Sequence, residues 1–152
     1  MKEFCAAIEI EAPAAKVWQC LTDFASYAAW NPFIYRAAGD TAVGARLQLW
    51  LRLHDGLRIK VQTTVARVRV ERELCWIGHL LTPGLIDGEH RLTIEPINPA
   101  KVLFKQHETY GGRLLPLFWW RLQKDAGSGF EAMNRALKYH LEQAPGRSYK
   151  PA

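Results

Sequence analysis

The sequence lacks the features of several large protein classes. Its cysteines are few and widely spaced, and their odd number argues against a disulfide scaffold or a CxxC metal or redox motif: Cys5, Cys20 and Cys75. The longest apolar run, Leu114 to Trp120, is far shorter than the roughly 20 residues that cross a bilayer. The first residues also lack the basic start and apolar stretch of a secretory signal. We therefore expect a cytoplasmic protein without stable membrane insertion.

Motifs of cofactor-dependent and nucleophilic enzymes are also missing. The sequence has no GxGxxG or GxxxxGK[ST] loop for nucleotides, and no HExxH motif or closely spaced His-carboxylate set for a metal. No serine stands in a context that supplies a base, which argues against a serine nucleophile. The net charge of +5 does not indicate nucleic acid binding without a recognisable module. We expect no metal, no cofactor and no nucleic acid partner.

The composition is that of one globular domain. Hydrophobic residues make up 49% of the chain and charged residues 23%, and 152 residues fall within the usual size of one domain. We expect residues 1–144 to form the domain. Residues 145–152, which begin with Pro145-Gly146 and lack apolar anchors, are expected to form a flexible tail. No pattern predicts an oligomer.

The periodicity of apolar residues predicts strands first and a long helix last. Residues 3–11 alternate as in a half-buried strand, and residues 13–30 have the spacing of one or two short helices. Further strands are predicted at 34–38, within a hairpin over 46–70, and at 74–81, 89–97 and 102–110. Residues 115–144 carry an apolar residue every three or four positions, as in one amphipathic helix, and Gly127 and Gly129 leave a kink open. This order is typical of an α+β fold in which a curved antiparallel sheet wraps around one helix.

Several short segments together resemble a known family. They are Pro13–Trp18, Trp30–Phe33, Trp76–Gly78, Gly84–His90, Glu108 with Gly111, and Gly129–Asn134. The chain resembles the START-related, or SRPBCC, superfamily, in its polyketide cyclase/dehydrase and lipid-transport-like branch. The resemblance covers nearly the whole chain and implies the helix-grip fold of the birch-pollen allergen. It also implies a cavity between sheet and helix that holds an apolar or amphipathic small molecule.

The hairpin around Asn98-Pro99 carries the strongest candidate for chemistry. Matching its inward-facing residues predicts three facing pairs: Ile94 with Phe104, Leu92 with Gln106, and His90 with Glu108. The last pair places an imidazole and a carboxyl in the expected cavity. There, low dielectric disfavours each charge alone whereas proximity favours the ion pair, and such coupled groups can act as acid and base. The same pair can instead be a structural hydrogen bond that orients the polar end of a ligand.

Neighbouring residues are expected to complete the site. In-phase pairing of the preceding strand places Gly78 opposite His90, which leaves room for a ligand. Trp76 is expected to form a wall, and Gln106 and Tyr110 are expected to add hydrogen bonds. The predicted ligand-binding residues are therefore Trp76, Gly78, His90, Leu92, Phe104, Gln106, Glu108 and Tyr110. Only His90 and Glu108 are catalytic candidates.

A second hairpin, around His54-Asp55-Gly56, has a basic outer face. If Leu53 faces Leu57, the apolar residues of both strands share one side of the sheet. The opposite side then places Arg52 beside Arg58, and Trp50 beside Lys60. Trp50 is expected to stack on Lys60 or to mark an interface with another molecule.

Three hypotheses about function follow. The leading one is binding, and conceivably transport, of a hydrophobic or amphipathic small molecule. The second is a cofactor-independent polyketide cyclase, aromatase or dehydratase that uses His90 or Glu108 as a proton shuttle. The third is a protein-interaction module that uses the basic face around Trp50. Proteins that share a fold often differ in function, so the geometry of the site is needed to distinguish the three hypotheses.

Overall fold

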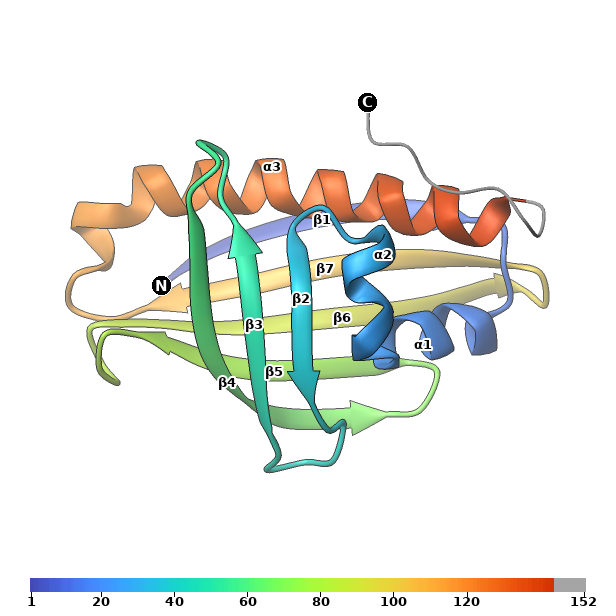
Figure 1. Cartoon of the computed structure of the whole chain (residues 1–152), viewed down its shortest axis with the longest axis horizontal. Coiled ribbons are helices and arrows are strands. Elements are labelled where there is room, and N and C mark those ends of the chain that lie inside the picture. Colours follow the sequence, from blue (N-terminus) through green and yellow to red (C-terminus); the bar gives the residue numbers. More distant parts are fainter. Residues whose placement is uncertain (144–152) are drawn as a thin grey trace.

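The computed structural model describes residues 1–143, in which a curved antiparallel sheet wraps around one long helix (Figure 1). The chain therefore has the α+β helix-grip architecture that the sequence predicts. The expected tail, 145–152, lies outside the described residues. Within residues 1–143, no helix combines the length and the apolar character needed to cross a membrane.

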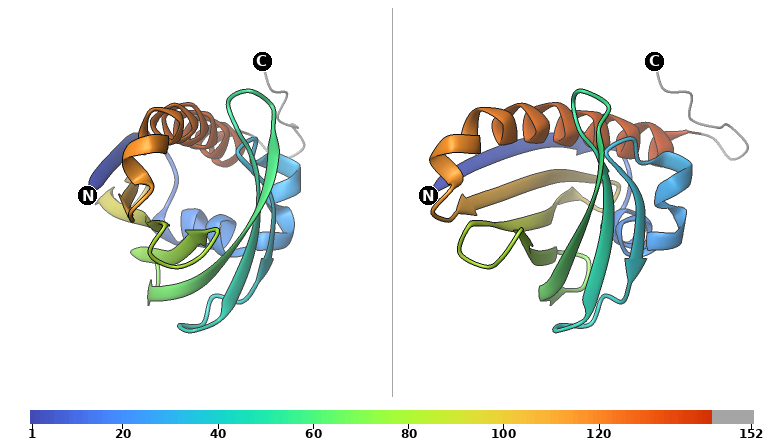
Figure 2. Two further views of the ribbon diagram at one scale, coloured as in Figure 1. Left: turned by 90° about the vertical axis from the view of Figure 1, so that its left-hand side faces the viewer. Right: turned by 60° about the vertical axis from the view of Figure 1, so that its left-hand side comes forward.

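Seven strands form a single sheet in the order β1-β7-β6-β5-β4-β3-β2. Their bounds are β1 Lys2–Ile10, β2 Ile34–Gly39, β3 Arg46–Arg52, β4 Arg58–Arg69, β5 Glu73–Leu80, β6 Ile86–Asn98 and β7 Lys101–Gly111. All neighbouring strands pair antiparallel. The two further views show the sheet curling so far that α3 closes its concave side between β1 and the β3–β4 hairpin (Figure 2).

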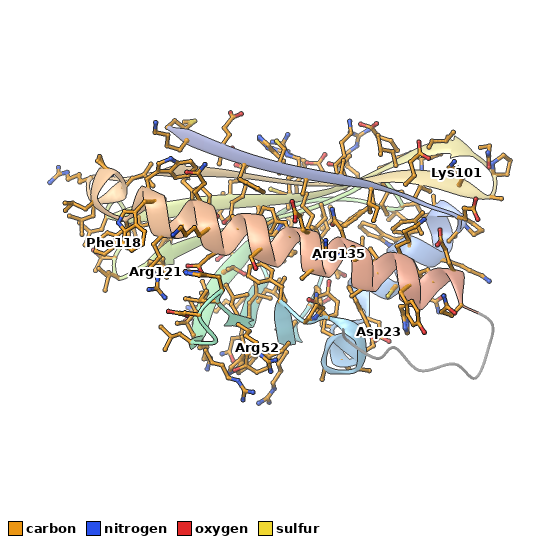
Figure 3. All side chains as sticks on the ribbon, turned by 90° about the horizontal axis from the view of Figure 1, so that it is seen from above. Asp23, Arg52, Lys101, Phe118, Arg121 and Arg135 are labelled. Carbon is orange, nitrogen blue, oxygen red and sulfur yellow. The ribbon has the colours of Figure 1, made fainter. Side chains whose placement is uncertain are left out.

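Helices occupy the two ends of the chain. Short helices α1 (Ala14–Thr22) and α2 (Tyr27–Trp30) follow β1 with a single 3-10 turn between them, and α3 spans Leu115–Glu142. Seen from above, α3 runs the length of the sheet, with Phe118 near one end of the molecule and Lys101 at the other (Figure 3). The Asn31 side chain accepts hydrogen bonds from the amides of Phe33 and Ile34, at 3.0 and 2.9 Å. This Asx turn leads the chain from α2 into β2.

Two predicted hairpin registers are confirmed. In the β3–β4 hairpin, Trp50 pairs with Lys60 and Arg52 with Arg58. In the β6–β7 hairpin, Ile94 pairs with Phe104, Leu92 with Gln106 and His90 with Glu108. Both hairpins have short turns, so matching their apolar faces leaves only one register.

The predicted pairing of β5 with β6 is wrong by two residues. Trp76, not Gly78, is the partner of His90, and Gly78 pairs with Gly88. A shift of two residues keeps every side chain on the same face, so apolar alternation does not distinguish the two registers. The loop between Leu80 and Ile86 sets the observed register, and its length was not fixed by any turn motif.

Helix α3 continues without interruption through Gly127 and Gly129. Both glycines lie where the helix closely approaches aromatic rings. A Cβ atom on Gly129 would overlap the ring of Phe33, and one on Gly127 would lie 3.3 Å from the outer edge of Phe4. The glycines therefore permit close packing and do not divide the helix.

We expect Gly129→Ala to destabilise the protein by about 1–3 kcal/mol, because Phe33 must move to admit the methyl group. Alanine stabilises a helix relative to glycine by about 1 kcal/mol, and the expected loss already includes this gain. Gly127→Ala is the matched control and is expected to be neutral or stabilising, since it touches only the end of Phe4. Urea unfolding of both variants measures the difference, and equal effects would contradict the packing argument.

Candidate ligand-binding cavity

A cavity of about 150 Å³ lies between the concave face of the sheet and the N-terminal half of α3. Most of its lining is apolar, with Leu49 and Leu51 on β3, Ile59 and Val61 on β4, and Ala126 on α3. Further along α3, the large side chains of Phe130, Met133 and Leu137 are fully buried against the sheet. The cavity therefore lies where α3 has a small side chain, Ala126, and no large side chain of the helix fills the space next to the sheet.

Two facing glycines widen the cavity on its sheet side. Gly78 and Gly88 are partners in the β5–β6 ladder, and both line the cavity. A Cβ atom on Gly88 would lie 2.8 Å from Oε1 of Glu108, and one on Gly78 would lie 2.9 Å from the methyl of Thr63. Gly78 lines the cavity as predicted, but its missing side chain faces Thr63 and Val61, and the glycine that adjoins Glu108 is Gly88.

Glu108 supplies the main polar group of the cavity. Its Oε2 accepts a hydrogen bond from the Tyr110 hydroxyl at 3.0 Å. No donor among residues 1–143 bonds its Oε1, which lies on the Gly88 side of the cavity. Burial raises the pKa of the Glu108 carboxyl from 4.5 to about 7, although the Tyr110 hydrogen bond acts in the opposite direction. Near neutral pH the carboxyl is therefore present in both protonated and ionised forms.

His90 is held as a neutral ring in the cavity wall. Its Nε2 lies 3.0 Å from Oε1 of Gln106, and its ring packs between Trp76 and Phe130 at centroid distances of 4.9 and 4.7 Å. Gln106 donates in turn to Oδ1 of Asn134 at 2.7 Å, so its oxygen is free to accept from His90. Burial lowers the pKa of His90 to about 4.

The predicted pairing of His90 with Glu108 is present, but the two side chains are not joined by a hydrogen bond. Nδ1 of His90 is 3.8 Å from Oε2 of Glu108, beyond hydrogen-bond distance. Both groups are buried. For each of them, the free-energy cost of holding a charge away from water exceeds the stabilisation that a neighbouring charge would give. The sequence brought the correct residues together, but desolvation keeps His90 neutral and disfavours the ionised form of Glu108.

The structure divides the predicted ligand-binding residues into two groups. Five of them line the cavity: Trp76, Gly78, His90, Glu108 and Tyr110. The other three, Leu92, Phe104 and Gln106, are fully buried outside the lining. Phe130 and Asn134 of α3 cover this part of the sheet, and Gln106 uses its amide to bond α3. Strand alternation predicts which face a residue lies on, but not which part of that face the helix fills.

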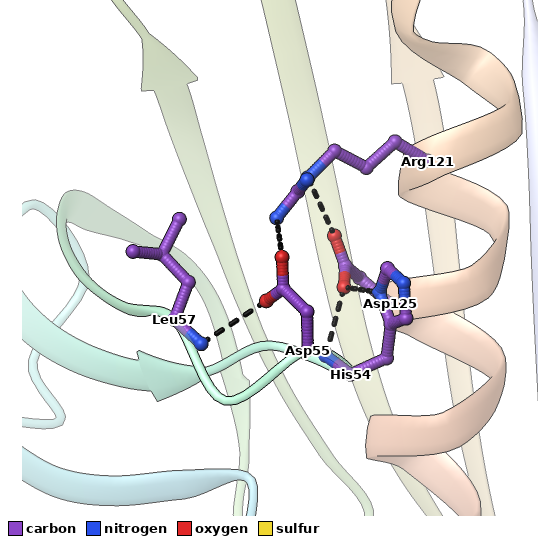
Figure 4. Close-up of polar contacts among 5 residues, drawn as sticks. All are labelled: His54, Asp55, Leu57, Arg121 and Asp125. Carbon is purple, nitrogen blue, oxygen red and sulfur yellow. Dashed lines mark hydrogen bonds and ion pairs between the residues drawn. The ribbon is translucent and has the colours of Figure 1, made fainter.

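A polar latch that the sequence analysis missed joins the β3–β4 turn to α3 (Figure 4). Asp125 lines the cavity and accepts from the backbone N–H of His54 at 3.0 Å, and its Oδ1 also lies 2.5 Å from Nδ1 of the His54 ring. Arg121 donates to Asp55 at 2.8 Å and lies 3.6 Å from Asp125. The latch thereby holds the hairpin turn against α3 beside the cavity.

The sequence contains few signals for this latch. His54 and Asp125 are separated by 71 residues, and the pattern around His54 predicts only a turn. The available signal was Asp125 itself, because an acidic residue next to Ala126 lies close to the apolar stripe of the helix.

Trp50 lies between two cations on the outer face of the sheet. Its ring centroid is 5.0 Å from Nζ of Lys60 and 4.4 Å from the guanidinium carbon of Arg36. The predicted stacking on Lys60 is confirmed, and Arg36 of β2 adds a second contact. The half-buried ring offers little free apolar surface, which weakens the interaction-module hypothesis.

Known proteins share the family and the fold of this chain. The model of a family described as polyketide cyclase / dehydrase and lipid transport matches residues 1–142. Comparison with curated proteins finds no match. A START superfamily protein from Mycobacterium smegmatis has a similar fold, with a TM-score of 0.74 and 21% identity over 93% of this chain and 97% of that one. The Zhui aromatase/cyclase from Streptomyces sp. R1128 has a TM-score of 0.79 and 14% identity, over 95% of this chain and 98% of that one. At these identities the similarity shows the fold alone.

The raised pKa of Glu108 predicts a pH-dependent stability. Between pH 4.5 and about 7 the folded protein holds a proton on Glu108 that the unfolded chain has lost, so this group lowers stability as pH rises. Glu108→Gln removes the effect. We expect its free energy of unfolding, relative to the parent, to increase by at most about 3 kcal/mol from pH 5 to pH 8.

Urea unfolding at the two pH values provides the measurement. Glu131→Gln, on the exposed side of α3, is the control and should shift the same difference very little. A constant difference for Glu108→Gln would show that the carboxyl is ionised across this range.

Proposed function

Because the chain belongs to the polyketide cyclase / dehydrase and lipid transport family, we propose that it binds one hydrophobic or amphipathic small molecule between the sheet and α3. One observation carries the proposal: the fold has an apolar cavity in which one oxygen of the Glu108 carboxyl has no hydrogen-bond donor among residues 1–143. Ligand sites commonly combine apolar walls with a few polar groups that fix orientation.

The lining suggests how such a ligand is oriented. Its apolar part would pack on Leu49, Leu51 and Val61, and its polar end would reach Glu108 beside Gly88. A cavity of about 150 Å³ accepts roughly one aromatic ring. A longer ligand would extend past the half-buried residues Leu53, Leu80 and Leu122, which border the cavity on its solvent side.

Filling the cavity should abolish binding. We expect Leu51→Trp and Ala126→Phe each to weaken binding of the neutral dye N-phenyl-1-naphthylamine by roughly tenfold or more. One ring of the dye would occupy the cavity and the rest would extend past its solvent side, and the introduced side chains fill the space for that ring. Fluorescence titration measures the affinity. Leu51 is half-buried, so its variant keeps the test valid if Ala126→Phe does not fold.

Ile77→Trp is the matched control, because Ile77 lies on the outer face of β5. Its affinity for the dye should equal that of the parent. Dye binding that survives in both cavity variants, or that is lost equally in the control, would contradict the proposal. Mass spectrometry of an extract from the purified protein would identify the class of any ligand that copurifies.

A second candidate function is proton transfer on a bound substrate. The observation that favours it is the Glu108 carboxyl, which faces the cavity with a pKa of about 7. A group that titrates near the working pH can both donate and accept a proton. His90 would act as a neutral neighbour in this scheme, and Glu108 would carry the proton alone. The similarity to the Zhui aromatase/cyclase fits such chemistry.

Hydrogen–deuterium exchange tests this candidate directly. In deuterated buffer, the protein should accelerate exchange of the hydrogens next to the carbonyl of the arylalkyl ketone 4-phenyl-2-butanone. The Glu108 carboxylate would remove a proton, exchange it with solvent and return a deuteron to the same carbon. We expect Glu108→Gln to lower the enzymatic rate by roughly a hundredfold while dye affinity stays within a few fold. Proton NMR follows the exchange. Unchanged exchange in the variant would restrict Glu108 to ligand binding.

A further inference from the structure

Large apolar side chains are exposed together at one end of the molecule. Leu117 and Trp120 on the first turns of α3 are 67% and 59% exposed, and Leu81 in the β5–β6 loop is 78% exposed. Phe118 lies on the same helical turns and is labelled at that end of α3 in Figure 3. Exposed apolar residues that gather in this way indicate an interaction site more often than scattered ones do.

The loop and the helix form one continuous surface. The backbone N–H of Arg113 donates to the carbonyl of Gly84 at 2.9 Å, and that of Leu114 donates to Leu85 at 2.9 Å. These bonds fasten the β5–β6 loop to the start of α3. We call the resulting surface the end patch, and define it by Leu81, Arg113, Leu117, Phe118, Trp120 and Lys124.

The end patch carries positive charge only. Its six residues include two cations, Arg113 and Lys124, and no acidic residue. In the described part of the chain, no carboxylate lies within 4.0 Å of Arg113 or Lys124. Lys124 instead lies over the ring of Trp120, with its Nζ 5.8 Å from the ring centroid.

Acidic residues beside the β5–β6 loop and in the β3–β4 turn are already engaged. Asp87 pairs with His79 at 2.7 Å and accepts from the amide of Gly84 at 2.9 Å. Asp55 is bound by Arg121 at 2.8 Å. Within residues 1–143, the cations of the end patch therefore have no carboxylate partner, and they are available to an anionic partner.

We propose that the end patch docks on the surface of a lipid bilayer that contains anionic headgroups. Protruding tryptophan, phenylalanine and leucine side chains beside free lysine and arginine are the composition of interfacial membrane-binding surfaces. Protein interfaces, by contrast, are depleted in lysine. The apolar side chains would enter the headgroup region while Arg113 and Lys124 bind phosphate groups.

The end patch also adjoins the cavity. Leu80, next to Leu81, and Leu122, between Trp120 and Lys124, both line the cavity on its half-buried side. Docking would therefore bring the solvent side of the cavity close to the bilayer. The proposal itself concerns only the surface, so it holds or fails independently of any ligand in the cavity.

Vesicle sedimentation tests the proposal. We expect the protein to bind mixed phosphatidylcholine–phosphatidylglycerol vesicles at low ionic strength, and to bind pure phosphatidylcholine vesicles much more weakly. The double variant Leu117→Glu with Trp120→Glu should lower the affinity for the anionic vesicles by roughly tenfold or more. The double variant Arg113→Ala with Lys124→Ala should remove most of the preference for the anionic vesicles.

Matched controls place the same changes elsewhere. Val70→Glu with Ile97→Glu alters two exposed apolar residues outside the end patch, and Arg72→Ala with Arg135→Ala removes two cations there. Both controls should change vesicle affinity by less than the corresponding end-patch variants. Unchanged dye binding in the end-patch variants would show that fold and cavity are intact.

Three results would overturn the proposal. The first is a failure to bind anionic vesicles at low ionic strength. The second is an equal loss of binding in the end-patch variants and their controls. The third is a dimer, detected by size-exclusion chromatography, that Leu117→Glu with Trp120→Glu dissociates while no vesicles are bound, because this outcome assigns the surface to a second copy of the chain.

Discussion

Helix α3, with α1 and α2 at one end, covers the concave face of a seven-stranded sheet (Figure 1), and the size of the side chains along α3 determines where the cavity lies. Over the C-terminal half of α3, Phe130, Met133 and Leu137 fill the space, and the interior is packed. Over the N-terminal half, the small side chain of Ala126 leaves space above the sheet. Gly78 and Gly88, which pair in the β5–β6 ladder, place no side chains in that space. The cavity is thus a consequence of side-chain size along one helix.

Desolvation then determines the chemistry of the polar groups inside. His90 and Glu108 face each other across a ladder, yet burial shifts their pKa values in opposite directions and favours the neutral form of each. Nε2 of His90 forms a hydrogen bond with Gln106, and Gln106 in turn bonds Asn134 of α3. Glu108 keeps one oxygen toward the cavity that has no hydrogen-bond donor among residues 1–143. The two residues therefore have different roles: His90 belongs to the packed wall, and Glu108 is the group that a ligand meets.

The same end of the molecule combines the cavity, the latch and the end patch. Asp125 and Arg121 hold the β3–β4 turn against α3, close to the half-buried residues that border the cavity. One helical turn away, Leu117 and Trp120 project from the molecule beside cations that have no carboxylate partner within residues 1–143. Binding of a hydrophobic molecule and docking on a lipid surface would thus use adjacent parts of one helix, while the other half of α3 stabilises the fold.

The sequence by itself determined the order of the elements, the family and the register of the β6–β7 hairpin. Strand alternation together with a short turn leaves one pairing, so His90 and Glu108 could be placed side by side from the residues alone. Tertiary structure alone decided the β5–β6 register, because a shift of two residues changes no face. It also decided the burial that neutralises His90 and the contact of His54 with Asp125, 71 residues away. Local periodicity encodes which side of an element is buried, whereas desolvation and long-range contacts depend on what the rest of the chain places against that side.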